Sequence, residues 1–207
     1  MIVAVFAAAA SFAAVPQVRT RAEELAQQVI ERTRTTQATY FVVTANEIYR
    51  DDGTIREFAA ELNQDDLHRV ETPRDRIVAN CRTGWNAHLN LATGKVSYGD
   101  QASGSVCGID PTAIIEDQAI TGSRQSQFGL LQLLRIARID GTRTYEVAAN
   151  GAIVGETLAD VTGKVRLVER AILLSDQLPA GDIFSEASLA KSVLSDELKR
   201  KASAPPK

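Results

Sequence analysis

The sequence is poor in the residue types that most often carry catalysis or bind nucleic acid. Among 207 residues there are two cysteines, two histidines and one tryptophan, and aromatic residues make up 5% of the chain. The formal net charge is −3, from 23 Lys and Arg against 26 Asp and Glu. Nucleic-acid-binding domains usually have a basic patch and a high pI. The composition therefore argues against a nucleic acid as partner.

Short catalytic motifs are also missing. The chain has no GxSxG, HExxH, CxxC or GxGxxG and no phosphate-binding GxxxxGKS/T, the signatures of hydrolases, metalloproteases and nucleotide-binding loops. His68 and His88 do not have metal-ligand spacing with the cysteines. We therefore expect a non-catalytic protein with no metal and no cofactor. The alternative is an enzyme on a cone-shaped α+β fold, which requires one of these histidines to meet an acidic residue in a cavity.

The N-terminus predicts export. Residues 1–15 form an uncharged apolar run closed by small residues. A membrane-spanning helix needs about 20 residues, whereas a short apolar run of this kind is typical of a secretory signal peptide. Ser11 and Ala13 fit the recognition positions, which gives a signal peptide at 1–13, one domain at 14–201 and a disordered tail at 202–207. A buried N-terminal helix or a membrane anchor is the alternative. We expect a periplasmic protein that is not an integral membrane protein.

The two cysteines, Cys81 and Cys107, agree with export. An even number of cysteines in an exported chain suggests a disulfide, with two separate buried thiols as the alternative. The bridge would tie the Gly- and Ser-rich segment 99–108 to the strand near 79–82. Closing a loop of this size stabilises a fold by roughly 3 kcal/mol.

The first half of the mature chain reads as one helix followed by strands. Residues 19–35 have apolar residues at helical spacing, with Thr20 as N-cap and Glu23 as its capping-box partner. A strand at 38–49 and a return strand at 54–63 flank a turn at 51–53, although 54–63 could also form a short helix. Further short strands are expected at 67–72, 76–82, 85–91 and 95–98, and a short helix from Asp110.

The second half is predicted to contain a meander between two helices. Apolar residues in 123–137 favour a helix slightly over a strand. Three strand-like runs follow at 143–149, 152–159 and 164–174, and Asn150-Gly151 is a hairpin signal between the first two. Residues 185–201 have an amphipathic pattern that predicts a C-terminal helix.

This order of elements resembles the periplasmic lipoprotein-carrier (LolA/LolB-like) superfamily, which includes lipid-transfer and envelope-stress regulator proteins. The resemblance rests on Tyr145–Glu156 (YEVAANGAIVGE), Asp160–Lys164 (DVTGK) and Leu178–Phe184 (LPAGDIF), together with the pairing of 38–50 with 55–63. It implies an α+β fold, in which a strongly curved antiparallel sheet, or incomplete β-barrel, has helices covering its concave side.

The resemblance implies a non-catalytic role, because an apolar concavity can hold an acyl chain without any reacting group. The first hypothesis is binding of a lipid-like ligand or a lipidated protein, and the second is an envelope regulator or adaptor that docks a partner protein. The arginine-rich stretch 69–82 would be either a solvated surface or a contact for that partner or for an anionic head group. Candidate cavity residues are Phe41, Val43, Phe58, Trp85, Phe128, Leu131 and Leu134. A dry, packed core built from the same side chains is the alternative.

Overall fold

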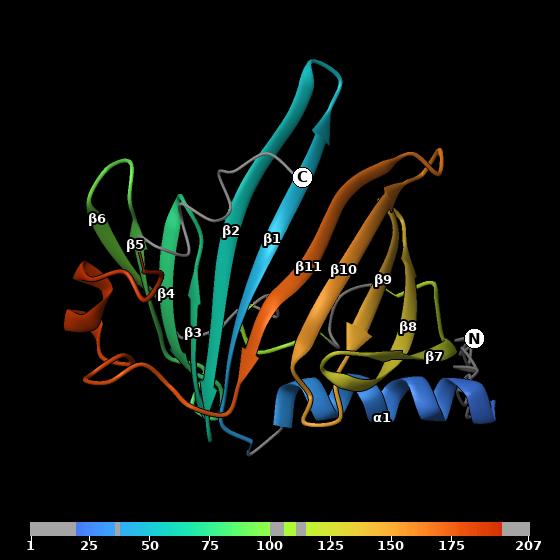
Figure 1. Cartoon of the computed structure of the whole chain (residues 1–207), viewed down its shortest axis with the longest axis horizontal. Helices are drawn as coiled ribbons and strands as arrows, with labels where there is room; N and C mark the ends of the chain where they lie inside the picture. The colour runs from blue at the N-terminus through green and yellow to red at the C-terminus, as the bar shows by residue number, and fades with distance from the viewer. Residues whose placement is uncertain (1–19, 36–37, 100–105, 111–114, 196–207) are drawn as a thin grey trace, which may run out of the picture.

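A computed structural model describes residues 20–35, 38–99, 106–110 and 115–195. It consists of one strongly curved antiparallel sheet of eleven strands, in the order β6-β5-β4-β3-β2-β1-β11-β10-β9-β8-β7, with an α-helix across one end (Figure 1). The strands are β1 (Tyr40–Arg50), β2 (Gly53–Gln64), β3 (Leu67–Glu71), β4 (Asp75–Asn80), β5 (Asn86–Asn90), β6 (Lys95–Gly99), β7 (Asp117–Ser126), β8 (Gly129–Arg138), β9 (Gly141–Val147), β10 (Ile153–Asp160) and β11 (Val165–Ser175).

The sheet is made of two meanders that meet in its middle. Strands β1 to β6 pair in sequence order, and so do β7 to β11, whereas β1 pairs with β11 to join the two sets. The predicted hairpin at 51–53 is confirmed by the pairing of Arg50 with Gly53. The predicted meander of the last third is confirmed as β9, β10 and β11.

The two faces of the sheet are covered by different segments. Helix α1 (Arg21–Thr35) begins with the predicted capping box, in which the Glu23 backbone N–H donates to Thr20 Oγ1 at 3.3 Å. Its buried residues Ala26, Val29 and Ile30 pack on β8 and β9. We call this face, which also carries Val42 of β1, the inner face.

The opposite, outer face is covered by the C-terminal segment 178–194. Phe41 and Val43 pack there with Leu62, Ile183 and Leu194. Polar contacts hold the segment as well, from three side chains that we call the outer-face clamp: Arg69, Glu71 and Arg76. The fully buried Arg69 donates to the carbonyls of Ile183, Ser188 and Lys191 at 3.0, 3.2 and 2.6 Å, and Arg76 donates to Leu189 O at 2.8 Å.

Two helix predictions are wrong. Residues 123–137 form parts of β7 and β8, joined by a turn before Gly129. Within 185–195, only the 3-10 helix η1 (Glu186–Ala190) forms. The outer-face clamp explains the second difference, because its guanidinium groups take carbonyls that a longer helix would need for its own hydrogen bonds. The described residues therefore contain one α-helix rather than several helices over a concave side.

Some expectations fall outside the described residues. These are the signal peptide at 1–13, the tail at 202–207, most of the short helix expected from Asp110, and the last residues of the expected C-terminal helix. No helix in the described part of the chain combines the length and the apolar character that crossing a membrane requires.

Candidate functional site

A cavity of about 490 Å³ lies against the inner face of the sheet. Both meanders contribute residues to it. Strands β1 and β2 lie on one side of the seam, which is the pairing of β1 with β11, and β9, β10 and β11 lie on the other. Residues 108–110 form a wall above it. The apolar lining consists of Val42, Ala59, Ala60, Val70, Ile109, Tyr145 and Ile153, and the charged lining of Glu61, Asp110, Arg138, Arg143, Glu156 and Glu169.

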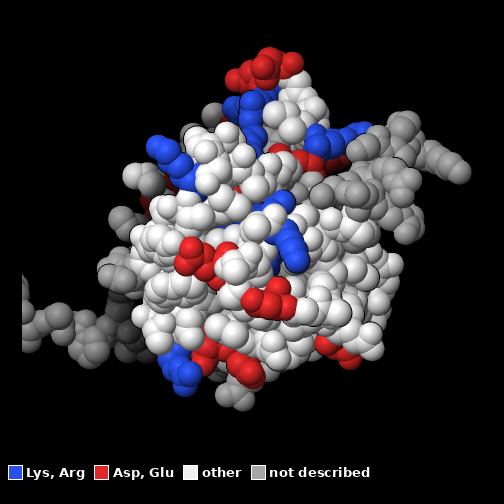
Figure 2. All heavy atoms as spheres, turned by 90° about the vertical axis from the view of Figure 1, so that its left-hand side faces the viewer, with Lys and Arg blue, Asp and Glu red and all other residues white. Residues whose placement is uncertain are grey.

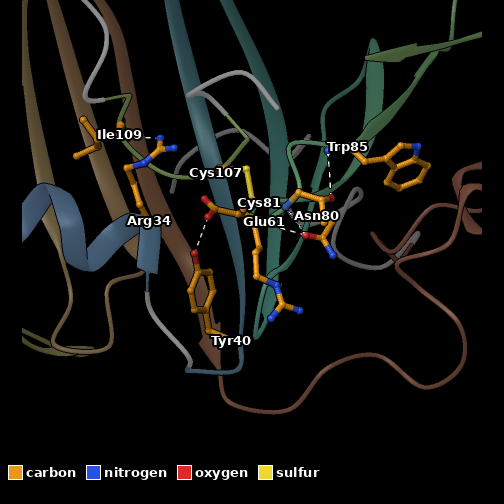
Figure 3. The surroundings of a disulfide bond; sticks show 10 residues. Arg34, Tyr40, Glu61, Asn80, Cys81, Trp85, Cys107 and Ile109 are labelled. Carbon is orange, nitrogen blue, oxygen red and sulfur yellow. Dashed lines mark hydrogen bonds between the residues drawn. A yellow bond between two sulfur atoms is a disulfide. The ribbon is translucent and has the colours of Figure 1, made fainter. Parts of the chain in front are cut away.

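The wall is fixed by the disulfide and by helix α1. Cys81 and Cys107 are joined, as predicted, with their Cα atoms 5.7 Å apart (Figure 3). The backbone N–H of Ile109 donates to Thr33 Oγ1 at 3.1 Å, and Arg34 donates to Ile109 O at 3.4 Å. Gly108 has φ of +82°, and a Cβ there would lie 2.5 Å from Thr33 O. Only glycine allows this close approach of wall and helix.

Three glutamates face the cavity from neighbouring parts of the sheet. Glu156 of β10 is directly opposite Glu169 of β11, and Glu169 is directly opposite Asn46 of β1. Glu61 of β2 lies across from Val42 and accepts a hydrogen bond from Tyr40 Oη at 2.6 Å (Figure 3). Like charges directly opposite each other destabilise a sheet, so this arrangement requires compensation.

Part of the compensation comes from Arg143, which forms an ion pair with Glu156. The remainder comes from protonation. Burial, followed by the charges of Glu156 and Glu61, raises the pKa of Glu169 to about 8, although hydrogen bonds from Asn46 and Thr44 oppose the shift. Burial also raises the pKa of Glu156 and of Glu61, against the effects of Arg143 and of Tyr40. Burial and the neighbouring carboxylates therefore favour the protonated form of Glu169 near neutral pH.

Several polar atoms at the cavity have no hydrogen-bond partner among the described residues. Asn46 is 9% exposed and its Oδ1 is unpaired, as are Nε of Arg138 and Nε of Arg143. Leaving a buried polar atom unpaired costs about 1–3 kcal/mol. Unpaired acceptors and donors around a cavity are what a polar ligand group or water would satisfy.

The structure places none of the predicted cavity residues in this cavity. Phe41, Val43 and Phe58 belong to the packed outer-face cluster with Ile183. Phe128 and Leu131 pack around Tyr40 and Val42, and Leu134 packs under α1. Trp85 is 37% exposed and points away from the disulfide (Figure 3). The faces of β1 are thus the reverse of the expectation, because the C-terminal segment buries the Phe41 side.

Both histidines lie outside this cavity. His88 Nε2 lies 2.7 Å from Asp75 Oδ1, but neither histidine lines the cavity. His68 is buried, and burial lowers its pKa to about 4. Within the described ranges, no group of three or more His, Cys, Asp or Glu side chains is arranged to hold a metal ion.

The arginine-rich stretch 69–82 is divided between interior and surface. Arg69 and Arg76 belong to the outer-face clamp, whereas the side chains of Arg74 and Arg82 are 60% and 75% exposed. Figure 2 views the molecule from its β6 side, where Lys and Arg side chains alternate with Asp and Glu on a largely uncharged surface. The described residues on this face form no extended basic patch for an anionic head group.

Sequence reasoning missed Glu61, Asn46, Glu156 and Glu169 as site residues. A weak signal for two of them was present, since Glu156 and Glu169 are carboxylates within strand-like runs. A carboxylate in such a run either points to solvent or faces a polar cavity, and one strand alone does not distinguish the two.

No protein-family model and no curated protein matches the chain. Several solved structures match the chain in fold. MucB matches with a TM-score of 0.55 at 13% identity, over 80% of this chain and 64% of that one. An uncharacterised conserved protein from Thermus thermophilus matches with a TM-score of 0.53 at 12% identity, over 82% of this chain and 93% of that one. A chain of the MucA/MucB complex from Pseudomonas aeruginosa matches with a TM-score of 0.53 at 14% identity, over 80% of this chain and 61% of that one.

A LolA superfamily protein from Nitrosomonas europaea is also matched, with a TM-score of 0.39 at 12% identity, over 79% of this chain and 99% of that one. At such identities, structural likeness identifies the fold and leaves the ligand open. At the level of the fold, the resemblance predicted from the sequence is supported: the chain shares the fold of MucB and of the Thermus thermophilus protein.

Proposed function

We propose that this chain is a non-catalytic, exported binding protein that holds one amphiphilic ligand, a free lipid or the lipid of a lipidated protein, in the inner-face cavity. The cavity itself carries the proposal. Its volume of about 490 Å³ lies within the range of roughly 300–1,000 Å³ of small-molecule sites.

The lining suits an amphiphile. Val42, Val70 and Ile153 offer apolar surface, and burying an apolar chain there gains about 25 cal/mol per Å² removed from water. Charged side chains occupy the same cavity, so a ligand with a polar end fits better than a pure hydrocarbon. The disulfide supports an oxidising compartment, which we infer to be the periplasm.

The test is to fill the cavity. Ala59→Phe places a ring among the lining residues, and Ile172→Phe adds the same ring at a position that is 43% exposed. We expect the exported wild-type protein and Ile172→Phe to retain co-purified lipid, measured by native mass spectrometry. Ala59→Phe should lose it while keeping the wild-type circular dichroism spectrum. Equal lipid retention by all three proteins, or none in any, would reject the proposal.

Docking of a partner protein is the second candidate. The sheet does not close, and its edge strand β6 exposes Val96 and Tyr98 by 38% and 61%. An exposed edge strand is a template for pairing with a strand of another chain. MucB, a fold relative, has been solved in complex with MucA. Val96→Lys should weaken capture of an envelope partner without changing lipid retention, which separates the two functions.

A further inference from the structure

The cavity is electrically polarised along the sheet. Glu61, Asn46 and Glu169 lie on the adjacent strands β2, β1 and β11. Arg143 and Arg138 lie on β9 and β8, two and three strands beyond β11. Strands are spaced about 4.8 Å apart, so roughly 10–14 Å separate the two ends. Arg143 is already paired with Glu156.

At the end of the cavity that carries Glu61 and Glu169, one buried hydrogen-bond acceptor has no donor among the described residues. Asn46 is nine-tenths buried and donates to Glu169, while its Oδ1 has no partner in the described structure. Glu169 forms no ion pair with any described residue. A carboxylate and an amide oxygen on directly opposed residues therefore face the cavity together, and both are hydrogen-bond acceptors when Glu169 is ionised.

We infer that the ligand carries an ammonium group, which binds at Glu169 and Asn46 while its apolar chain lies along Val42, Val70 and Ile153. A primary ammonium has three donors and no acceptor, which matches this pair of acceptors. When Glu61 is ionised, its negative charge favours the same cation. This inference rests on the proposed function and specifies the chemical class of its ligand as an amphiphilic amine.

Binding of the cation is coupled to release of a proton. The raised pKa favours the protonated form of Glu169, and binding of an ammonium requires the ionised form. Affinity for an ammonium ligand therefore rises with pH until Glu169 is ionised without ligand. The other ionisable groups that line the cavity together with Glu169 are Glu61 from β2, Glu156 from β10, Arg143 and Tyr145 from β9, Arg138 from β8, and Asp110 from the wall. Of these, Glu61 and Glu156 oppose its ionisation.

The experiment compares octylamine, octanol and octanoate by calorimetry on the disulfide-bonded mature protein. These probes share one chain and differ in the head group. We expect octylamine to bind about tenfold or more tightly than octanol, because a hydrogen bond to a charged group is worth about 1.5–3 kcal/mol. Proton release should be measurable from buffers of different ionisation enthalpy. Octanoate or octanol as the tightest probe would overturn the inference and leave the proposed function standing. Failure of all three would overturn both.

Variants identify the acceptors. Glu169→Gln should equalise octylamine and octanol and abolish proton release, with octanol affinity unchanged, and Asn46→Ala should lower the preference for octylamine severalfold. Glu146→Gln removes a carboxylate that pairs with Arg124 outside the cavity and should leave the preference intact. Equal preference in Glu169→Gln and wild type would place the ammonium elsewhere. Ethylamine that binds as tightly as octylamine would show that a small free amine, rather than an amphiphile, is the ligand.

Discussion

Glu156 and Glu169 stand directly opposite each other on β10 and β11, and Arg143 forms an ion pair with Glu156 and none with Glu169. The pair therefore has one compensated carboxylate and one that keeps its proton near neutral pH. Protonation of Glu169 avoids repulsion between the two carboxylates, but it makes the stability of the fold depend on pH.

The first prediction follows from the proton on Glu169, whose pKa is raised to about 8 from an ordinary value of 4.5. The folded protein holds this proton more tightly than the unfolded chain does. Stability from this group is therefore complete below about pH 4.5 and is lost as pH rises through about 8. Relative to Glu169→Gln, wild type should lose roughly 3 kcal/mol of unfolding free energy between about pH 5 and pH 8.

Urea unfolding at both pH values measures this difference. Glu146→Gln, which removes a carboxylate outside the cavity, is the control and should follow wild type. Parallel pH profiles for wild type and Glu169→Gln would mean that Glu169 is ionised throughout.

The second prediction concerns His68, which is 1% exposed and whose pKa burial lowers to about 4. The folded protein keeps His68 neutral, whereas the unfolded chain protonates it below about pH 6.5. Stability is therefore complete above about pH 6.5 and falls as pH drops toward about 4. Between about pH 7 and pH 5, wild type should lose roughly 2 kcal/mol more than His68→Gln does. The partly exposed His88 gives the control, His88→Gln, and an unchanged profile in His68→Gln would contradict the assignment.

The third prediction tests the outer-face clamp. Arg69→Met removes the donors to three carbonyls and leaves Glu71 with Arg76 as its remaining cation, 3.6 Å away. Breaking a buried ion pair costs about 3–5 kcal/mol, and limited proteolysis should then cut within 178–194. Arg74→Met, at an exposed side chain in the same stretch, should cost about 0–1 kcal/mol. Equal protection of the segment in both variants would exclude the clamp role.

The fourth prediction tests the close contact of wall and helix. Gly108 and Gly163 both have φ of +82°, but a Cβ at Gly163 would meet nothing within 4 Å. Gly163→Ala should therefore cost only the backbone strain of about 1–2 kcal/mol. Gly108→Ala adds a clash with the backbone of Thr33, so its melting temperature should fall clearly further and its cavity should lose ligand. Similar melting temperatures would show that the wall moves freely.

The fifth prediction concerns the disulfide, which closes a separation of 26 residues. Replacing both Cys81 and Cys107 by serine should cost about 3 kcal/mol in urea unfolding. Ligand affinity should also fall, because the bridge anchors the wall at 108–110. Full affinity in the double variant would show that α1 alone positions the wall.

Local signals predicted most of the strands correctly. The turn at 51–53 and Asn150-Gly151 specify hairpins between runs of alternating or β-branched residues, and both hairpins form. The segment 123–137 was misassigned because Leu130, Leu131, Leu133 and Leu134 occur in adjacent pairs. A strand that packs on both faces and a helix with a broad apolar side give the same pattern there.

The site was less accessible from sequence, because it depends on which face of β1 is filled by distant segments. Because small Ala45 follows Phe41 and Val43 on one side of the strand, that side was expected to face the cavity. That side is buried instead by the C-terminal segment, for example by Ile183, which lies 142 positions after Phe41 in the chain. Alternation predicts that a strand has two faces, but packing between distant segments determines which of them borders the cavity.

The joining of the two meanders has a consequence for how the protein folds. Among the described strands, nine of the ten pairings connect strands that are consecutive in the chain, and only the pairing of β1 with β11 joins strands that are distant in the sequence. Local hairpins close quickly, whereas pairing across a long separation is slow. Asn46 lies on one side of that seam and Glu169 on the other. The ligand site therefore does not exist in either half alone, and a bound ligand would report directly that the last long-range step of folding has been completed.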